Sequence, residues 1–285
     1  MGSVTATGQA IRTREVTDQV RTFSALAAAG FRRYATYRQA TAAGVFTNTI
    51  FGFLRCYVLL AVAAGAAGGL AAGYDREQLA TFVWAGQGML AVAALWGWAE
   101  LADRIRTGDV AADLLRPVPP VVSYLAADLG RAGHAGLTRF VPPMLVGALF
   151  FDLYEPRRAQ TVPLFVLSAL LATLACFGCR YLLNCLAYWL LDLRGPMTLW
   201  TLASGLLVGL YFPLRFLPGW LCLALWLGTP FPSLLQAPLD VLVERDPPAV
   251  QAGIVAVQAV WAALTLAACG WVQRRAERRL VVQGG

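Results

Sequence analysis

The residues of this chain that can do chemistry are few, and their types exclude several kinds of site. The sequence has one histidine, His134, which excludes a metal site built from several histidines. All 23 basic residues are arginine, and none is lysine. Because a P-loop needs a lysine to reach the nucleotide phosphates, we expect no ATP hydrolysis by that route in this chain.

Nucleophiles give no clear catalytic constellation either. Cys176 and Cys179 have the spacing of a redox motif, but they lie in an apolar stretch, where a thiol packs as a small hydrophobe. Ser204 lies in a different apolar stretch from His134, and no hydrolase motif surrounds either residue. We therefore expect no enzyme. The remaining cysteines, which we also interpret as packing residues, are Cys56, Cys185, Cys222 and Cys269.

Polar residues inside apolar stretches are the more informative candidates. Arg180, Asn184 and Tyr188 are four residues apart, which places them on one helix face, and Arg55 lies in the middle of another apolar stretch. An arginine in mid-membrane costs about 2.5–3.5 kcal/mol on insertion scales, so both arginines should face protein or water. The polar face either lines a substrate path or joins helices by hydrogen bonds.

The charge partners of these arginines decide between the two interpretations. The acidic candidates near the predicted inner boundary are Glu100, Asp128 and Asp192. Without such a partner, Arg55 and Arg180 would favour an anionic or zwitterionic substrate over a cation.

The elements that position these residues follow from composition. The 285 residues are 58% hydrophobic and only 14% charged, and mean hydropathy is +0.60. Soluble domains are about 45–50% apolar and about 25% charged. The chain is therefore predicted to be an all-α polytopic membrane protein. Its net charge of +7 does not indicate nucleic-acid binding, because the arginines lie in short segments between apolar runs.

Six apolar stretches are predicted to cross the membrane as helices. A further stretch, residues 221–242, is interrupted by Gly228, Pro230, Pro232 and Pro238, which favours a re-entrant helical pair between spans five and six. Residues 19–40 carry an amphipathic basic pattern typical of a helix on the inner membrane surface. Residues 1–18 are predicted to be flexible and are not followed by the apolar core of a signal peptide. The six spans are residues 44–67, 79–101, 136–153, 163–191, 196–216 and 250–272.

The distribution of arginine predicts the orientation. Fifteen arginines fall in the inner segments of this topology and five in the outer loops. Positive charge favours the cytoplasmic side, so both termini are expected there. The prediction is one membrane domain, residues 41–273, with a basic cytoplasmic tail at 274–285.

The inner loop between spans two and three, residues 102–120, is predicted to carry a short helix outside the bilayer. Gly108 ends the preceding helix, and Asp109 is placed to cap the next one by accepting its free N–H groups. Pro117 ends that helix after Arg116. Leu114 and Leu115 would then form an exposed apolar pair, which is either a docking surface for a partner or packed against the chain's own bundle.

Residues 108–117, Gly-Asp-Val-Ala-Ala-Asp-Leu-Leu-Arg-Pro, resemble the inner-loop signature of type 2 ABC exporter permeases. The similarity is greatest to their bacterial small-molecule branch, the drug and viologen exporters, and residues 35–38 resemble the lead-in to span one in that branch. The interfacial helix, six spans and re-entrant pair agree with this family over nearly the whole chain.

The resemblance implies a permease subunit of an ATP-driven exporter in the bacterial inner membrane. A second permease subunit, identical or different, would complete the path for a small amphipathic molecule or drug. A separate ABC ATP-binding subunit, which holds the ATP and Mg²⁺, would dock on the loop helix; this chain would hold no cofactor. The alternatives are an ion-driven carrier, for which the spans hold almost no carboxylates, and a non-transporting membrane scaffold.

Overall fold

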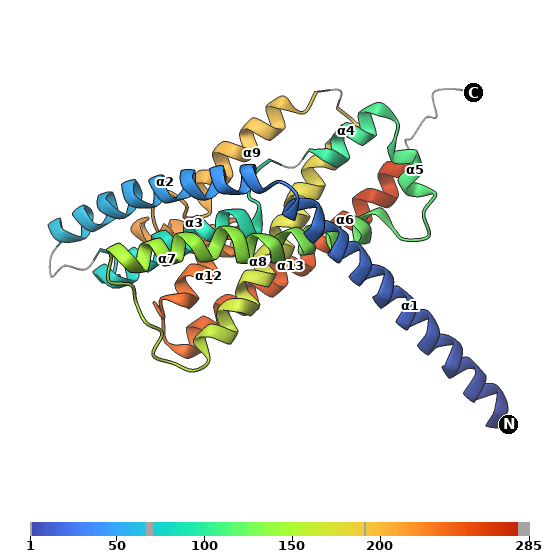
Figure 1. Cartoon of the computed structure of the whole chain (residues 1–285), viewed down its shortest axis with the longest axis horizontal. Coiled ribbons are helices and arrows are strands. Elements are labelled where there is room, and N and C mark those ends of the chain that lie inside the picture. The colour runs from blue at the N-terminus through green and yellow to red at the C-terminus, as the bar shows by residue number, and fades with distance from the viewer. Residues whose placement is uncertain (1, 67–70, 98, 191, 279–285) are drawn as a thin grey trace.

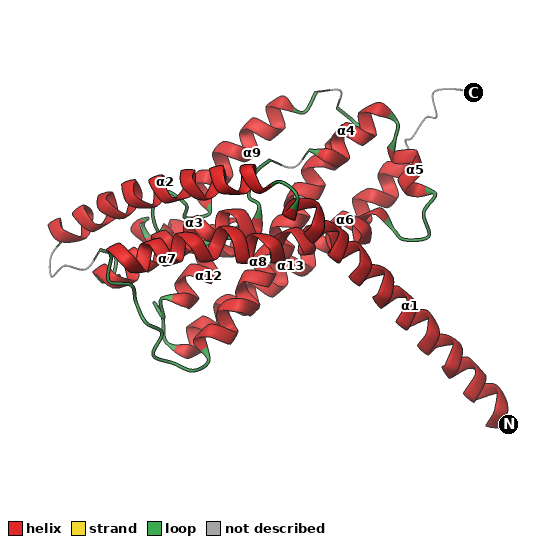
Figure 2. Cartoon of the chain, in the orientation of Figure 1, coloured by secondary structure: helices red, strands yellow, loops and turns green. Residues whose placement is uncertain are grey.

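The computed structural model describes residues 2–66, 71–97, 99–190 and 192–278, with side chains from residue 17 onward, and every named element in them is helical (Figures 1 and 2). This confirms the all-α prediction. The helices are α1 Gly2–Ala35, α2 Arg38–Gly65, α3 Arg76–Ala93, α4 Glu100–Thr107, α5 Val110–Leu114, α6 Pro120–Ala135, α7 Val141–Phe150, α8 Thr161–Cys185, α9 Arg194–Leu207, α10 Gly219–Gly228, α11 Phe231–Leu234, α12 Gln236–Leu242 and α13 Pro248–Glu277. Three shorter turns are η2 Gly136–Phe140, η3 Leu186–Tyr188 and η4 Leu214–Phe216.

Three helical stretches in the described residues are long and apolar enough to cross a membrane. They are Arg38–Gly65, Thr161–Tyr188 and Pro248–Glu277. These match the predicted spans one, four and six. The other three predicted spans are built from shorter helices, so the count of six remains a prediction.

The predicted second span is shorter than its apolar sequence. Its helix, α3, begins with a capping box in which Asp75 accepts from the N–H of Gln78 at 2.8 Å. It ends at Ala93 and not at residue 101, because Ala94 adopts a left-handed conformation and Gly97 follows at φ 89°. Arg131 donates to the freed carbonyl oxygens of Ala91 and Val92 at 2.6 and 2.8 Å.

The predicted third span is part of a longer helical run. α6, η2 and α7 follow one another without a break from Pro120 to Phe150, whereas the prediction was residues 136–153. The middle piece is a π-turn immediately before Pro142 and Pro143. Proline has no N–H to donate to a carbonyl four residues earlier, which explains the altered winding at this point.

The predicted fifth span also ends early, and the stretch after it is broken as expected. α9 ends at Leu207, two residues before Gly209, whose φ of 83° no other residue adopts easily. The side chain of Gln236 reaches this turn and accepts from the N–H of Leu214 at 2.9 Å. The short helices α10, α11 and α12 that follow show the predicted interruptions, and the re-entrant arrangement of residues 221–242 stays a prediction.

α1 begins at Gly2, ahead of the interfacial helix expected at 19–40, and projects away from the bundle at its N-terminal end (Figure 1). Its C-terminal half packs closely on α6. Gly30 lies against the backbone of Ala127, and Gly130 lies against the backbone of Ala27, so neither position has room for a side chain. At the other end of the chain Arg274 and Arg275 occupy the last turn of α13, and Arg279 lies outside the described residues.

Candidate functional site

The inner loop forms a compact helical tip made of α4 and α5. Gly108, at φ 83°, caps α4 in the left-handed conformation, and this position needs glycine. Asp109 stands at the N-cap of α5 but its side chain caps no backbone group, contrary to prediction. Its carboxylate accepts instead from the hydroxyl of Thr107 at 2.8 Å, which stabilises the turn itself.

The two leucines of the tip have different environments. Leu115 is 88% exposed, whereas Leu114 is half-buried. Val110, at the start of α5, is fully buried in a cluster with Phe177 and Tyr181 of α8. This cluster holds α5 on the bundle and directs Leu115 outward, so the exposed apolar group is one leucine and not a pair. Arg116 and Pro117, which follow it, are exposed.

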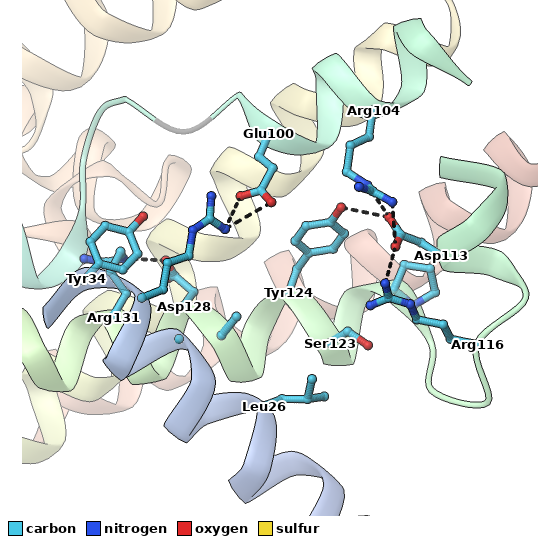
Figure 3. Close-up of a pocket in the computed structure, with 14 residues that line it drawn as sticks. Leu26, Tyr34, Glu100, Arg104, Asp113, Arg116, Ser123, Tyr124, Asp128 and Arg131 are labelled. Carbon is cyan, nitrogen blue, oxygen red and sulfur yellow. Dashed lines mark hydrogen bonds and ion pairs between the residues drawn. The ribbon is translucent and has the colours of Figure 1, made fainter. Parts of the chain in front are cut away.

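Asp113 is the residue that fixes the tip, and sequence reasoning assigned it no role. Arg104 donates to both of its carboxylate oxygens, from Nε at 2.7 Å and from Nη2 at 3.0 Å (Figure 3). The hydroxyl of Tyr124 donates to the same carboxylate at 3.1 Å, and Arg116 lies 3.7 Å away. The hydrogen bond to Asp113 raises the pKa of Arg104. The resulting clamp joins α4, α5 and α6.

The pocket in Figure 3 lies between this tip, α1 and α6, and has a volume of about 220 Å³. Arg33 of α1 closes one side by pairing with Glu100 of α4 at 2.9 Å. Glu100 is therefore the partner of Arg33 in α1 and not of Arg55 or Arg180. The arginines around this pocket already have carboxylate partners, which favours an interhelical joint over a binding site for an anion.

A buried ion-pair cluster lies behind the pocket. Asp128 of α6 accepts from Arg131 Nε at 2.7 Å and from Arg180 Nη2 at 2.8 Å. All three side chains are less than 10% exposed. Because Arg131 also binds the end of α3, the cluster connects α3, α6 and α8. Arg180 is thus half of a buried pair, and Asp128 is the partner that it takes among the three candidate acids.

The rest of the polar face on α8 also joins helices. Asn184 accepts from the N–H of Ala102 at 3.0 Å, which satisfies one of the free donors in the first turn of α4. The hydroxyl of Tyr188 accepts from Gln273 of α13 at 3.3 Å. Asp192, four residues after Tyr188, is exposed and pairs loosely with Arg194. This arrangement supports the helix-joining interpretation for Arg180, Asn184 and Tyr188.

Arg55 differs from these residues. Its Nε and Nη1 atoms are buried, and neither has a hydrogen-bond partner among the described residues. Arg55 and Arg180, which could not be distinguished from the sequence, therefore differ in the structure, because Arg180 has a carboxylate partner among the described residues and Arg55 has none.

A second polar cluster, also missed from sequence, lies at the opposite end of the bundle. Glu244, between α12 and α13, accepts from Thr161 Oγ1 at 2.5 Å, from the N–H of Arg158 at 2.8 Å and from Tyr154 at 2.9 Å. Burial alone would raise its pKa, but these donors and the charge of Arg158 outweigh burial and lower it. Glu244 thereby connects the loop before α8 to the loop before α13.

The described residues hold no group of three or more histidine, cysteine or carboxylate side chains that fits a metal ion. All six cysteines are free thiols, and Cys176 is fully buried beside the end of α3. The burial of Cys176 agrees with the packing role predicted for it.

Comparison with known proteins identifies a family. Residues 48–284 match the sequence model of a family described as ABC-2 family transporter protein. Neither the curated proteins nor the solved structures compared with the chain gave a match. The matched range contains Arg55, the loop tip and the Asp128 cluster.

Proposed function

Because the chain belongs to the ABC-2 family of transporter proteins, we propose that it is the permease subunit of an ATP-driven exporter whose ATPase docks on the tip formed by α4 and α5. The proposed cargo is a small amphipathic molecule. ATP and Mg²⁺ would be held by the partner chain, since this sequence has no lysine for a P-loop.

The observation that carries this proposal is Leu115, 88% exposed on a tip whose backbone is held by the Asp113 clamp. A single large apolar side chain on a rigid support is suited to insertion in a groove of a partner. Burying one leucine contributes about 1.5–3 kcal/mol to association. The flanking Arg116 would contribute charge at the rim of the same contact.

Force applied to the tip has a physical route into the membrane domain. α4 is tied to α8 by Asn184, and the clamp is tied to α6 by Tyr124. α6 and α8 are in turn joined at Asp128, beside the end of α3. We propose that movement of a docked ATPase displaces these helices together and so alternates access to the path.

The proposed topology has six crossings with both termini on the cytoplasmic side of a bacterial inner membrane. α2, α8 and α13 would cross as single helices. α3, α6 with α7, and α9 with the chain that follows it would supply the other three, and α10 to α12 would dip into the membrane from outside. Two permease subunits, identical or different, would enclose the path.

This function is tested by transport in inverted membrane vesicles that contain the chain and the ABC ATPase with which it co-purifies. ATP-dependent, vanadate-sensitive uptake of an amphipathic dye into the vesicles is the expected result. Uptake that follows a proton or sodium gradient without ATP would contradict the proposal and favour an ion-driven carrier.

A further inference from the structure

Arg55 is a partly buried cation that has no anion as partner among the described residues. Its Nε and Nη1 are buried and make no hydrogen bond within the described residues. Other arginines in the predicted spans differ, since Arg180 pairs with Asp128 at 2.8 Å and Arg139 donates to the carbonyl oxygen of Ala40 at 3.0 Å. An unpaired guanidinium at this depth is costly, so it needs a partner from elsewhere.

The surroundings of Arg55 are apolar and aromatic. Tyr211, in the irregular segment after α9, stands close enough for electrostatic interaction with it. Phe212 and Phe216 of the same segment pack against a buried cluster of α2 and α3 residues that includes Cys56, the next residue in the chain. The broken end of α9 thus lies beside the middle of α2, and helices interrupted within the membrane commonly mark binding sites in transporters.

The face of α2 next to Arg55 is open. Leu54 and Tyr57 are 57% and 62% exposed, and α2 lies along one edge of the bundle (Figure 1). A second copy of this chain placed against that edge brings no carboxylate from α2 or α9, because residues 19–74 and 193–239 contain no aspartate or glutamate. Self-association through these faces therefore leaves the charge of Arg55 uncompensated.

We propose that Arg55 binds the anionic head group of the transported molecule, a phosphate, sulfate or carboxylate carried on an apolar body. The inference rests on the proposed function and specifies its substrate class. A guanidinium offers two parallel N–H donors to such a head group. Tyr211 and the exposed apolar face of α2 would contact the body. The cargo is then an amphipathic anion or zwitterion and not a simple cation.

The test is ligand binding to the purified full-length chain in phosphatidylcholine nanodiscs, followed by thermal unfolding. Dodecyl phosphate is the probe, and dodecyltrimethylammonium is the matched cation with the same tail. We expect dodecyl phosphate to raise the unfolding midpoint and Arg55→Gln to weaken its apparent affinity about tenfold or more, since a charge-assisted hydrogen bond is lost. Arg55→Lys should keep intermediate affinity, and the control Arg139→Gln should match the wild type.

Three results would overturn the proposal. The first is equal binding of dodecyl phosphate by the wild type and Arg55→Gln, and the second is preferential binding of the cation. The third is an Arg55-dependent stabilisation by phosphatidylglycerol in the nanodisc that blocks dodecyl phosphate, since the anion would then be a resident lipid. The binding assay needs no ATP or ATPase. If dodecyl phosphate does not bind through Arg55 but ATP-driven transport is still observed, only the proposed substrate class is rejected and the proposed function stands.

Discussion

Arg180 of α8 donates to Asp128 of α6 across 2.8 Å, and both side chains are almost fully buried. Arg131 donates to the second oxygen of the same carboxylate, so one negative charge holds two positive ones. This explains how an arginine is tolerated inside an apolar helix. It also makes Asp128, which lies outside the predicted spans, the residue on which the junction of α3, α6 and α8 depends.

The two sides of this cluster should therefore respond differently to mutation. Asp128→Asn strands two buried arginines and is expected to destabilise the protein by about 3–5 kcal/mol. Arg180→Gln leaves Asp128 with Arg131 and should cost less. Detergent-solubilised thermal melting of the two variants, with the exposed Asp192→Asn as control, measures the difference. A larger fall in melting temperature for Arg180→Gln than for Asp128→Asn would show that Asp128 does not compensate the charges of both arginines.

The clamp at the tip gives a second prediction. Asp113→Asn removes the charged acceptor of Arg104, and a hydrogen bond to a charged group contributes about 1.5–3 kcal/mol. Amide hydrogen exchange in residues 108–117 should accelerate about tenfold or more, with little change in the exchange of α8. Asp103→Asn, which alters an exposed carboxylate of α4, is the matched control. Equal exchange in both variants would mean that Asp113 does not fix the tip.

Glu244 gives a prediction for pH. Its pKa is lowered in the folded protein, so the stability it contributes is present above the pKa of an unfolded glutamate, about 4.3, and is lost as pH falls through the folded pKa. Glu244→Gln should flatten the acid side of the stability curve, because glutamine has no charge to lose. Melting temperatures of wild type and variant between about pH 3 and pH 7 test this, and parallel curves would rule out the contribution.

The long apolar helices were predictable from sequence, but the points where apolar sequence stops being helical were not. The sequence stays apolar past Ala93, so composition does not mark the end of α3. That end is stabilised by Arg131, which lies 40 residues after Ala91 and donates to its carbonyl oxygen. α9 likewise ends inside an apolar stretch, at a turn that Gln236 stabilises. Such ends are set by tertiary contacts, which a sequence window does not contain.

The candidate site shows the same division. The cap at Gly108 was predicted from local turn chemistry, whereas of the predicted exposed pair only Leu115 is exposed and Leu114 is half-buried. The role of Asp113 was missed, although its spacing of nine residues from Arg104 kept both within one loop. Whether Arg55 or Arg180 finds a carboxylate partner depends on which helix packs beside it. The sequence alone therefore could not decide whether these arginines line a substrate path or join helices.

The topology is tested by cysteine labelling. Single cysteines at the exposed positions Arg76 and Arg157, in a variant without native cysteines, should react in intact cells with a thiol reagent that does not cross the membrane. A cysteine at Arg275 should react only after the cells are opened. Labelling of position 275 in intact cells would contradict six crossings and the re-entrant interpretation of α10 to α12.

The central claim is that Leu115 docks the ATPase, and co-purification of the ATPase with the chain tests it most directly. Leu115→Asp should reduce the bound ATPase about tenfold or more, because burial of one leucine contributes about 1.5–3 kcal/mol. Leu115→Met, which keeps an apolar side chain of similar size, should retain binding, and both variants should melt at the wild-type temperature. Full recovery of the ATPase with a correctly folded Leu115→Asp variant, still coupled to transport, would contradict the account.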